Sequence, residues 1–493
     1  MRGLVAARIC IAALLIGMAA PVLADSPPLS TQAYVEAELA AAPKGTRFGL
    51  LVVDDSGKVI VSINPDQRFI PASNTKMFTT AAAYALLPGM DQPDVAGGAA
   101  VWLESSKRRV VQDVVLYGNG DARMSSASDC VTDCLARLAD AIATKSKIVG
   151  DIIGIDTLYP DQRWSPGMSW NNIGSNDATA ASALSLDSNE LVIRVTPAKV
   201  GQRPNLVASP YLSIQNVAFT SVPGGKSSLK LVHTINSREF RLIGELPADA
   251  SEWHEIVGVD DPALYSVSRL QVMLRQRGVR VVGVVRTQHR PIDLNDDPVT
   301  RPVGVDPNAD VARDAPLTRL TPPPLAEDVT IINKVSQNNH AELLLRRVAS
   351  IEGSSLEDGL AAERAIFDKA GIPREGYDFS DGSGMSTYNR VSPRAAVALL
   401  RWIDTQPWGK AWYASLPIAG VDGTLKNRFK GTPLENNLIA KTGTLNATNA
   451  LSGSFRAASG KRLTFAFFAN DVPDGQTALP VMEAVLLGIA ASN

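Results

Sequence analysis

Histidine and cysteine are scarce in this 493-residue sequence, with four and three copies. A histidine base for a hydrolase triad would have to come from His233, His254, His289 or His340, and no G-x-S-x-G elbow accompanies them. The pair His254-Glu255 also lacks the second histidine of an H-E-x-x-H zinc motif. The sequence therefore does not support a histidine-based hydrolase or a metalloprotease, and we expect no metal and no cofactor.

Neither sign of charge dominates, because 48 Lys and Arg oppose 50 Asp and Glu to give a formal net charge of -2. A strongly basic chain attracts nucleic acid or an anionic membrane through its overall field, and this chain has no such field. We expect no nucleic-acid partner, and we expect the ligand to be recognised by a local site.

The longest apolar run stands at the N-terminus and is short. Arg2 and Arg8 precede apolar residues 9–18, and small residues follow up to Ala24, as is typical of a cleavable signal peptide. A retained anchor is the weaker alternative, because the run falls short of the ~20 residues that span a bilayer. We expect residues 1–24 to be removed near Ala24, leaving a periplasmic or otherwise exported protein with at most peripheral membrane association.

Cleavage would leave two cysteines, Cys130 and Cys134. An oxidising compartment permits a disulfide between them, although a bridge inside a regular helix would require a local distortion. Two structural thiols are the alternative, and two cysteines without a third ligand make a poor zinc site.

The chain is too long for one ordinary domain, and its 45% hydrophobic residues suffice for several cores. From about residue 95 to 310, short β-rich runs separated by Gly and Pro predict inserted material, and residues 290–315 predict a surface connection back to the first domain. The predicted strands of the insertion include 110–117, 191–196, 230–235 and 240–243.

Helices and strands alternate on both sides of this insertion. Because strands occur at both ends of the chain, we predict one antiparallel sheet covered by helices and closed by the first and last parts. The predicted helices are 31–42, 77–87, 325–334, 339–352 and 478–491, and the predicted strands are 48–54, 58–63, 438–445, 450–455 and 463–469.

Ser73 and Lys76 form an S-x-x-K motif at the first turn of a predicted buried helix. Residues three apart share one helix face, so the amine can take the hydroxyl proton, and the helix N-terminus directs N–H groups toward developing negative charge. The pKa of Lys76 must fall by about three units from ~10.4, which burial and a nearby cation, Lys441, can cause. A second S-x-x-K, Ser227 to Lys230, is predicted to lie in a strand, where residues three apart face opposite sides.

Two more short motifs follow in order along the chain. The S-x-N motif Ser336 to Asn338 lies between two predicted helices, in a turn that can aim both side chains into a cleft. The K-T-G motif Lys441 to Gly443 lies on a predicted strand, and its glycine would let a substrate backbone approach closely. Together the three motifs supply a serine nucleophile, an amine base, a proton relay and a carboxylate-binding cation.

Three features near these motifs are less specific. We expect His340 to lie on a helix surface, and we expect Glu342 to be a packing or capping partner. The stretch Asp381 to Gly384 is compatible with a simple turn or with a role in lining the cleft.

The ordered motifs resemble those of low-molecular-mass penicillin-binding proteins, in the D-alanyl-D-alanine carboxypeptidase and endopeptidase family that carries a large insertion between the first two motifs. Ser336 lies 263 positions after Ser73 (336 minus 73), farther than in a compact β-lactamase. The resemblance covers nearly the whole mature chain. It also rests on residues 118–121, 183–186, 381–384, 421–425 and 441–444.

The resemblance implies an α+β fold with a penicillin-binding, transpeptidase-like domain, in which an antiparallel sheet covered by helices adjoins a helical subdomain. Two β-rich domains, II and III, would be inserted in it, with domain III nested inside domain II. The expected boundaries are 25–95 and 311–493 for the penicillin-binding domain, 96–187 and 252–310 for domain II, and 188–251 for domain III.

The resemblance also assigns roles to the motif residues. Ser73 would be the acylated nucleophile, Lys76 its base and Ser336 the relay of the proton to the departing amine. The expected substrate-binding residues are Asn338 for the amide, Lys441 with the hydroxyls of Thr442 and Thr444 for the terminal carboxylate, and Gly443 beside the substrate backbone. The backbone N–H groups of Ser73 and Thr444 would form the oxyanion hole.

These roles imply a serine DD-peptidase for peptidoglycan muropeptides that end in D-Ala-D-Ala, acylated in turn by β-lactam antibiotics. Carboxypeptidase and endopeptidase action both stay open. A β-lactamase shares the motifs but needs fast deacylation, and the inserted mass argues against it. An inactive scaffold that binds through its insertion is disfavoured by the intact Ser73, Lys76 and Lys441.

Overall fold

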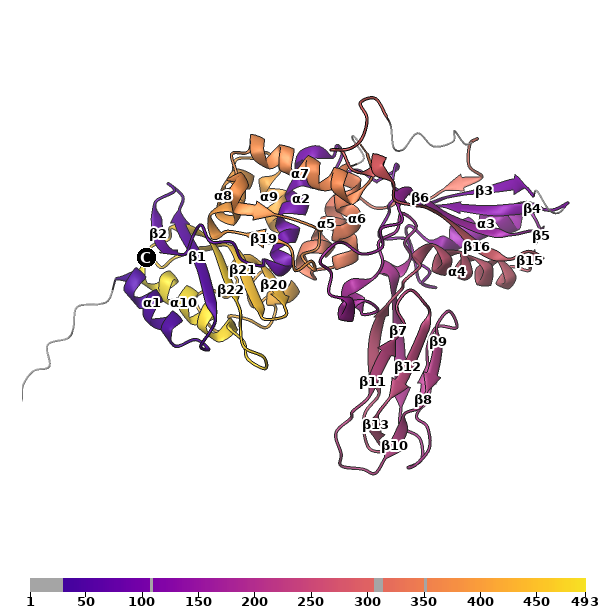
Figure 1. Ribbon diagram of the computed structural model, residues 1–493, viewed down its shortest axis with the longest axis horizontal. Helices are drawn as coiled ribbons and strands as arrows, with labels where there is room; N and C mark the ends of the chain where they lie inside the picture. Colours follow the sequence, from indigo (N-terminus) through magenta and orange to yellow (C-terminus); the bar gives the residue numbers. More distant parts are fainter. Residues whose placement is uncertain (1–29, 107–109, 306–313, 350–352) are drawn as a thin grey trace, which may run out of the picture.

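The computed structural model describes residues 30–106, 110–305, 314–349 and 353–493. The expected signal peptide lies outside these residues, as do the last three residues of the helix predicted over 339–352. Within the described ranges, no helix combines the length and the apolar character that a bilayer crossing needs. Figure 1 shows a sheet with its helices at one end, a second sheet at the other, and a set of strands that projects from between them.

The first sheet is built from both ends of the chain, as the sequence predicts. Its strand order is β2-β1-β22-β21-β20, and every neighbouring pair is antiparallel. Its strands are β1 (Arg47–Asp54), β2 (Val59–Ile63), β20 (Ile439–Leu445), β21 (Thr448–Arg456) and β22 (Arg462–Asn470).

Successive residues of β1 face the two sides of this sheet, which is the period-two pattern of a strand. Leu50 and Val52 pack with helices α1 (Thr31–Ala40) and α10 (Leu479–Ser492) on one side. Leu51 and Val53 belong to the core on the other side, which contains the helical subdomain. The sheet is therefore the middle layer of three.

Helix α2 (Thr75–Leu86) runs through the centre of the helical subdomain, and every residue from Thr75 to Ala83 is buried. The 3-10 turn η1 (Ala72–Asn74) precedes it and contains Ser73, so regular α-helix begins two residues after the serine. The surrounding helices are α5 (Leu325–Lys334), α6 (Asn338–Ala349), α7 (Leu356–Lys369), α8 (Pro393–Asp404) and α9 (Gly409–Ala414), beside the short pair β18 (Tyr377–Asp378) and β19 (Arg390–Val391).

The second sheet has the order β16-β6-β4-β3-β17 and mixes parallel and antiparallel pairs. Helices α3 (Leu135–Lys145) and α4 (Pro262–Gln276) pack with it around a separate core. Both helices were missed among the short β-rich runs that surround them. The strands are β3 (Ala100–Ser105), β4 (Gln112–Tyr117), β6 (Ile152–Pro160), β16 (Val285–Arg290) and β17 (Thr318–Arg319), beside the pair β5 (Ile148–Val149) and β15 (Arg280–Val281).

The projecting strands form small sheets in which exposed and more buried residues alternate, as in β7 and β12. Figure 1 shows them extending away from the two larger sheets. We call them the nested strands: β7 (Glu190–Thr196), β8 (Asn205–Val207), β9 (Ser213–Asn216), β10 (Phe219–Ser221), β11 (Lys230–His233), β12 (Glu239–Ile243), β13 (Glu245–Pro247) and β14 (Trp253–Gly258).

A disulfide joins Cys130 and Cys134, whose Cα atoms lie 5.8 Å apart. It precedes α3 instead of lying inside it, because Asp133 adopts a left-handed φ of 58° and Cys134 is extended. The local distortion that pairing requires is thus a turn before the helix.

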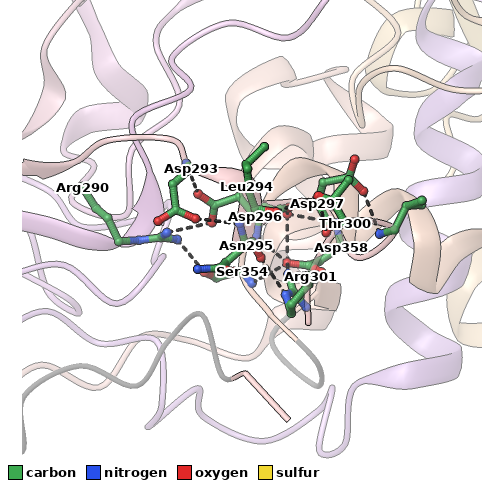
Figure 2. Close-up of polar contacts among 12 residues, drawn as sticks. Arg290, Asp293, Leu294, Asn295, Asp296, Asp297, Thr300, Arg301, Ser354 and Asp358 are labelled. Carbon is green, nitrogen blue, oxygen red and sulfur yellow. Dashed lines mark hydrogen bonds and ion pairs between the residues drawn. The ribbon is translucent and has the colours of Figure 1, made fainter. Parts of the chain in front are cut away.

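The connection after β16 runs over the surface through residues 290–305, and residues 306–313 lie outside the described ranges. Ion pairs of 2.7 Å join Arg290 to Asp296 and Arg301 to Asp358, and Ser355 on the far side donates to the Asp296 carbonyl oxygen. Figure 2 shows the two ion pairs, Arg290 with Asp296 and Arg301 with Asp358. They fasten the end of the insertion to the start of α7.

Candidate active site

The turn before α2 presents Ser73 to the amine of Lys76. Ala72, just before the serine, has a φ of 47°, a strained value for a residue other than glycine, and the chain then enters the helix. One turn along, Lys76 Nζ lies 2.9 Å from Ser73 Oγ. The helix thus brings the two groups into the contact that the S-x-x-K spacing predicts.

Lys76 is fully buried and its amine is held by three oxygen atoms. Besides Ser73, it donates to Asn338 Oδ1 and to the Ser383 carbonyl oxygen, both at 2.6 Å. Burial lowers the pKa of Lys76 to about 8, against an opposing effect of the carboxylates of Asp381, Glu342 and Asp177. A minority of the amine, about a tenth to a fifth, is therefore neutral near physiological pH.

Ser336 lies in the turn between α5 and α6 and has a left-handed φ of 65°. This turn aims its hydroxyl at Lys441, whose Nζ lies 2.9 Å from Ser336 Oγ and 3.1 Å from the Thr442 carbonyl oxygen. Burial, followed by the charge of Lys76, lowers the pKa of the fully buried Lys441 well below its ordinary value.

Asn338 connects two of the motifs. Its Oδ1 accepts from Lys76, and its Nδ2 donates to the Asp177 carbonyl oxygen at 2.9 Å. Its side chain is thus already fixed between the helix of the nucleophile and a loop of the insertion.

The K-T-G motif lies on β20, the edge strand of the first sheet, and packs directly against η1. A Cβ at Gly443 would stand 2.7 Å from the Pro71 carbonyl oxygen, so glycine is needed for the approach of the protein's own backbone. The sequence predicts that Gly443 makes space for the backbone of a substrate, whereas here the glycine makes space for Pro71. The Thr442 and Thr424 hydroxyls lie 2.7 Å apart next to it.

A cleft of about 610 Å³ opens in front of these groups. Ser73, Ser336, Asn338, Thr442, Gly443 and Thr444 line it, whereas the two lysines lie behind the hydroxyls. All eight predicted site residues therefore converge on one place.

The cleft also contains residues that the sequence did not point to, Asn172, Asp177, Met385 and Arg428. Arg428 pairs with Glu483 at 2.6 Å, and its Nη2 is buried with no hydrogen-bond partner among the described residues. Its proximity in sequence to the stretch 421–425 was the only available signal, since a lone arginine has no motif.

Glu342 is a capping partner, as expected. Its Oε1 accepts from the N–H groups of Gly382 and Ser383 at 3.1 and 3.0 Å, and its Oε2 pairs with Arg346 at 3.1 Å. Asp381 is also fully buried and accepts from Gly384 N. The stretch 381–384 is thus a turn beneath Lys76, and only Met385 beyond it lines the cleft.

The expectation for His340 was wrong. Only 3% of its side chain is exposed, and its ring bonds to Asp328 and to Ser188 Oγ. Almost all of α6 is buried because the insertion covers the face that an isolated helix would turn to water. The second S-x-x-K behaves as a decoy: Ser227 precedes β11, and Lys230 begins it.

The family model described as "D-Ala-D-Ala carboxypeptidase 3 (S13) family" matches residues 31–489. A D-alanyl-D-alanine carboxypeptidase of Actinomadura sp. (strain R39) is 30% identical over 469 residues, covering 91% of this chain and 82% of that protein. The D-alanyl-D-alanine carboxypeptidase DacB of Haemophilus influenzae is 24% identical, covering 88% and 87%.

Solved structures show the same fold. The crystal structure of penicillin-binding protein 4 (dacB) from Haemophilus influenzae superimposes with a TM-score of 0.76 at 22% identity, over 92% of this chain and 97% of that one. The same protein complexed with a β-lactam gives a TM-score of 0.70 at 22% identity, with the same coverage. The predicted α+β fold class is confirmed.

Proposed function

The chain belongs to the D-Ala-D-Ala carboxypeptidase 3 (S13) family, and we propose that it is an exported serine DD-peptidase that works through an acyl-enzyme. The observation that carries the proposal is the meeting of two hydroxyl-amine pairs at one cleft, Ser73 with Lys76 and Ser336 with Lys441. Its substrates are peptidoglycan peptides ending in D-Ala-D-Ala, and β-lactams acylate the same serine.

Acylation begins with neutral Lys76, whose pKa of about 8 leaves part of the population able to accept a proton. Lys76 takes the proton of Ser73 Oγ while this oxygen attacks the carbonyl carbon of the penultimate D-Ala. The N–H groups of Ser73 and Thr444 stabilise the resulting oxyanion. Collapse breaks the peptide bond, and the proton that Lys76 took passes by way of Ser336 to the departing amine, so that D-alanine leaves neutral at nitrogen and Lys76 is neutral again.

Deacylation reverses this order with water in place of the amine. Lys76 accepts a proton from water as its oxygen attacks the acyl carbon, and the proton returns to Ser73 Oγ as the ester breaks. The products are the shortened peptide acid and free enzyme. If the departing amine belongs to a second peptide instead of free D-alanine, the same steps amount to endopeptidase action.

The terminal carboxylate would bind the hydroxyls of Thr442 and Thr444, which line the cleft in front of Lys441. Because Lys441 is buried behind Ser336, it acts on the carboxylate through the field of its charge, which a bound anion favours. Arg428 adds a second cation at the same cleft, with Nη2 unpaired among the described residues.

Labelling with a fluorescent penicillin tests the nucleophile. The mature protein should form a stable covalent adduct at Ser73, mapped by peptide mass, and Ser73→Ala should form none. Labelling that persists in the variant would refute the assignment, and rapid turnover of the penicillin would favour a β-lactamase.

Paired substrates test the carboxylate site. Lys441→Ala and Arg428→Gln should each raise KM for a D-Ala-D-Ala peptide with a free carboxylate more than for its amide. Equal losses on both substrates would remove the carboxylate-binding role from the residue concerned.

A further inference from the structure

A second hollow, of about 480 Å³, lies between the nested strands and the loop that leads to the cleft. We call it the aromatic groove. Its volume falls in the roughly 300–1,000 Å³ range of small-molecule sites. Its walls come from 3-10 helix η2 (Trp170–Asn172) with the residues that follow, from β11 and from β14.

Trp170 stands at this groove with 74% of its surface exposed, and Trp253 and Ile235 line it as well. Tryptophan is usually largely buried, so an indole this exposed leaves apolar surface in contact with water. A ligand that covers the indole would remove this surface from water. Among the described residues, Trp170 is the only tryptophan among the exposed large hydrophobic side chains. The exposure is therefore specific to this place.

Polar groups stand around the aromatic surface. Asn171, Lys230 and Glu255 line the groove, and within the described ranges none of these side chains has a hydrogen-bond or ion-pair partner. The groove thus offers an amide, an ammonium and a carboxylate beside flat apolar faces. A pyranose matches this pattern, because its C–H faces stack on indole while its hydroxyl and N-acetyl groups lie at the edge.

The groove and the catalytic cleft border each other at η2. Trp170 and Asn171 line the groove, and Asn172 lines the cleft. The following loop is fixed to the nested strands, where Gly258 N donates to the Gly174 carbonyl oxygen at 3.0 Å. It then reaches Asp177, whose carbonyl oxygen holds the Asn338 amide.

We propose that the aromatic groove binds the glycan strand of the substrate while its stem peptide enters the cleft. The inference rests on the proposed function, because the peptide of peptidoglycan is covalently attached to an amino-sugar polymer. Because the groove and the cleft border each other at η2, a ligand whose peptide occupies the cleft can reach the groove, which favours this occupant over a separate protein partner.

Direct binding tests the groove without catalysis. Peptide-free glycan strands released by an amidase are titrated into the full-length mature Ser73→Ala protein, with tryptophan fluorescence and calorimetry as readouts. We expect saturable binding, which Trp170→Ala weakens about tenfold in Kd and Trp170→Phe restores in large part. Val207→Ala, an exposed residue of β8 away from both hollows, is the matched control, and dextran is the control polymer.

Kinetics supply the second readout. For Trp170→Ala, the ratio of kcat/KM on glycan-linked peptide to kcat/KM on free D-Ala-D-Ala peptide should fall about tenfold, mainly through KM. Unchanged Kd and ratio would overturn the inference while leaving the peptidase intact. A change in self-association alone, seen by sedimentation, would also overturn it. Failure of the unmodified protein, which retains Ser73, to hydrolyse free peptide would refute the proposed function instead.

Discussion

Helix α2 and the nested strands differ in which kinds of side chain they bury and expose. From Thr75 to Ala83 every residue of α2 is buried, including the amine of Lys76. In the nested strands apolar residues such as Val192, Val207 and Val232 are exposed. One region removes a charged group from water, and the other leaves hydrophobic groups in water.

This difference indicates how strongly function constrains the side chains of each region. A buried amine with a low pKa needs many fixed neighbours, so the chemistry depends on atoms far from the cleft surface. An exposed apolar surface needs few neighbours, and its residues can change with little effect on folding. Substitutions should therefore have large effects in the first region and small ones in the second.

Removal of the buried amine should have the largest effect. Lys76→Ala takes away the proposed base, so the rate of penicillin acylation should fall about 10³-fold. Lys58→Ala, on an exposed turn, is the matched control and should acylate at the normal rate. Stopped-flow labelling measures both, and acylation of Lys76→Ala within tenfold of the unmodified protein would show that another group is the base.

The capping carboxylate comes next. Glu342→Ala leaves the N–H groups of Gly382 and Ser383 without their acceptor and the buried Arg346 without its counter-ion. The free energy of unfolding should fall by about 3–5 kcal/mol in urea titrations.

The exposed ion pair of Asp66 and Arg394 offers the matched control. Asp66→Ala should cost no more than about 1 kcal/mol, because both partners are largely in water. Equal costs for Glu342→Ala and Asp66→Ala would contradict the contrast between a buried and an exposed pair.

Buried Glu363 should make stability depend on pH. Its side chain is fully buried, and this burial raises its pKa from 4.5 to about 8. Between these values the unfolded chain releases the proton and the folded chain keeps it, so the unfolding free energy falls as pH rises. Glu363→Gln should reduce this fall by about 3.5 kcal/mol between pH 5 and 8 in paired denaturation curves. Parallel curves would show that Glu363 is ionised in the folded protein.

The smallest effect is expected on the nested strands. Val207 is 68% exposed, so Val207→Ala should change the unfolding free energy by no more than about 0.5 kcal/mol. A loss above 2 kcal/mol would mean that this surface contributes to packing and would erase the contrast with α2.

The sequence predicted best what depends on local geometry. The i, i+3 relation of Ser73 and Lys76 follows from the helix alone, and the strand at each end implied a shared sheet. The turn at Ser336 was recognisable because it separates two periodic helices. The helix relation and the turn need no knowledge of distant contacts, and the shared sheet needs only the presence of strands at both ends.

Features that depend on tertiary contacts were missed. His340 is buried because the insertion covers α6, and Gly443 is required by Pro71, which is remote in sequence. Arg428 joins the cleft only through the packing of the folded chain. The domain boundaries and the roles of the site residues stay predictions until variants and truncations test them.

The pairing of β1 with β22 has a consequence for biosynthesis. The hydrogen bond from Ile70 N to Asn470 Oδ1 spans 400 positions, so the two flanks of the first sheet meet only when nearly all the polypeptide has emerged. Long-range pairings of this kind form late. Ser73 is therefore synthesised long before the strand that carries Lys441, and a polypeptide that still lacks this strand has no amine beside Ser336. Activity would be withheld from nascent chains by topology alone.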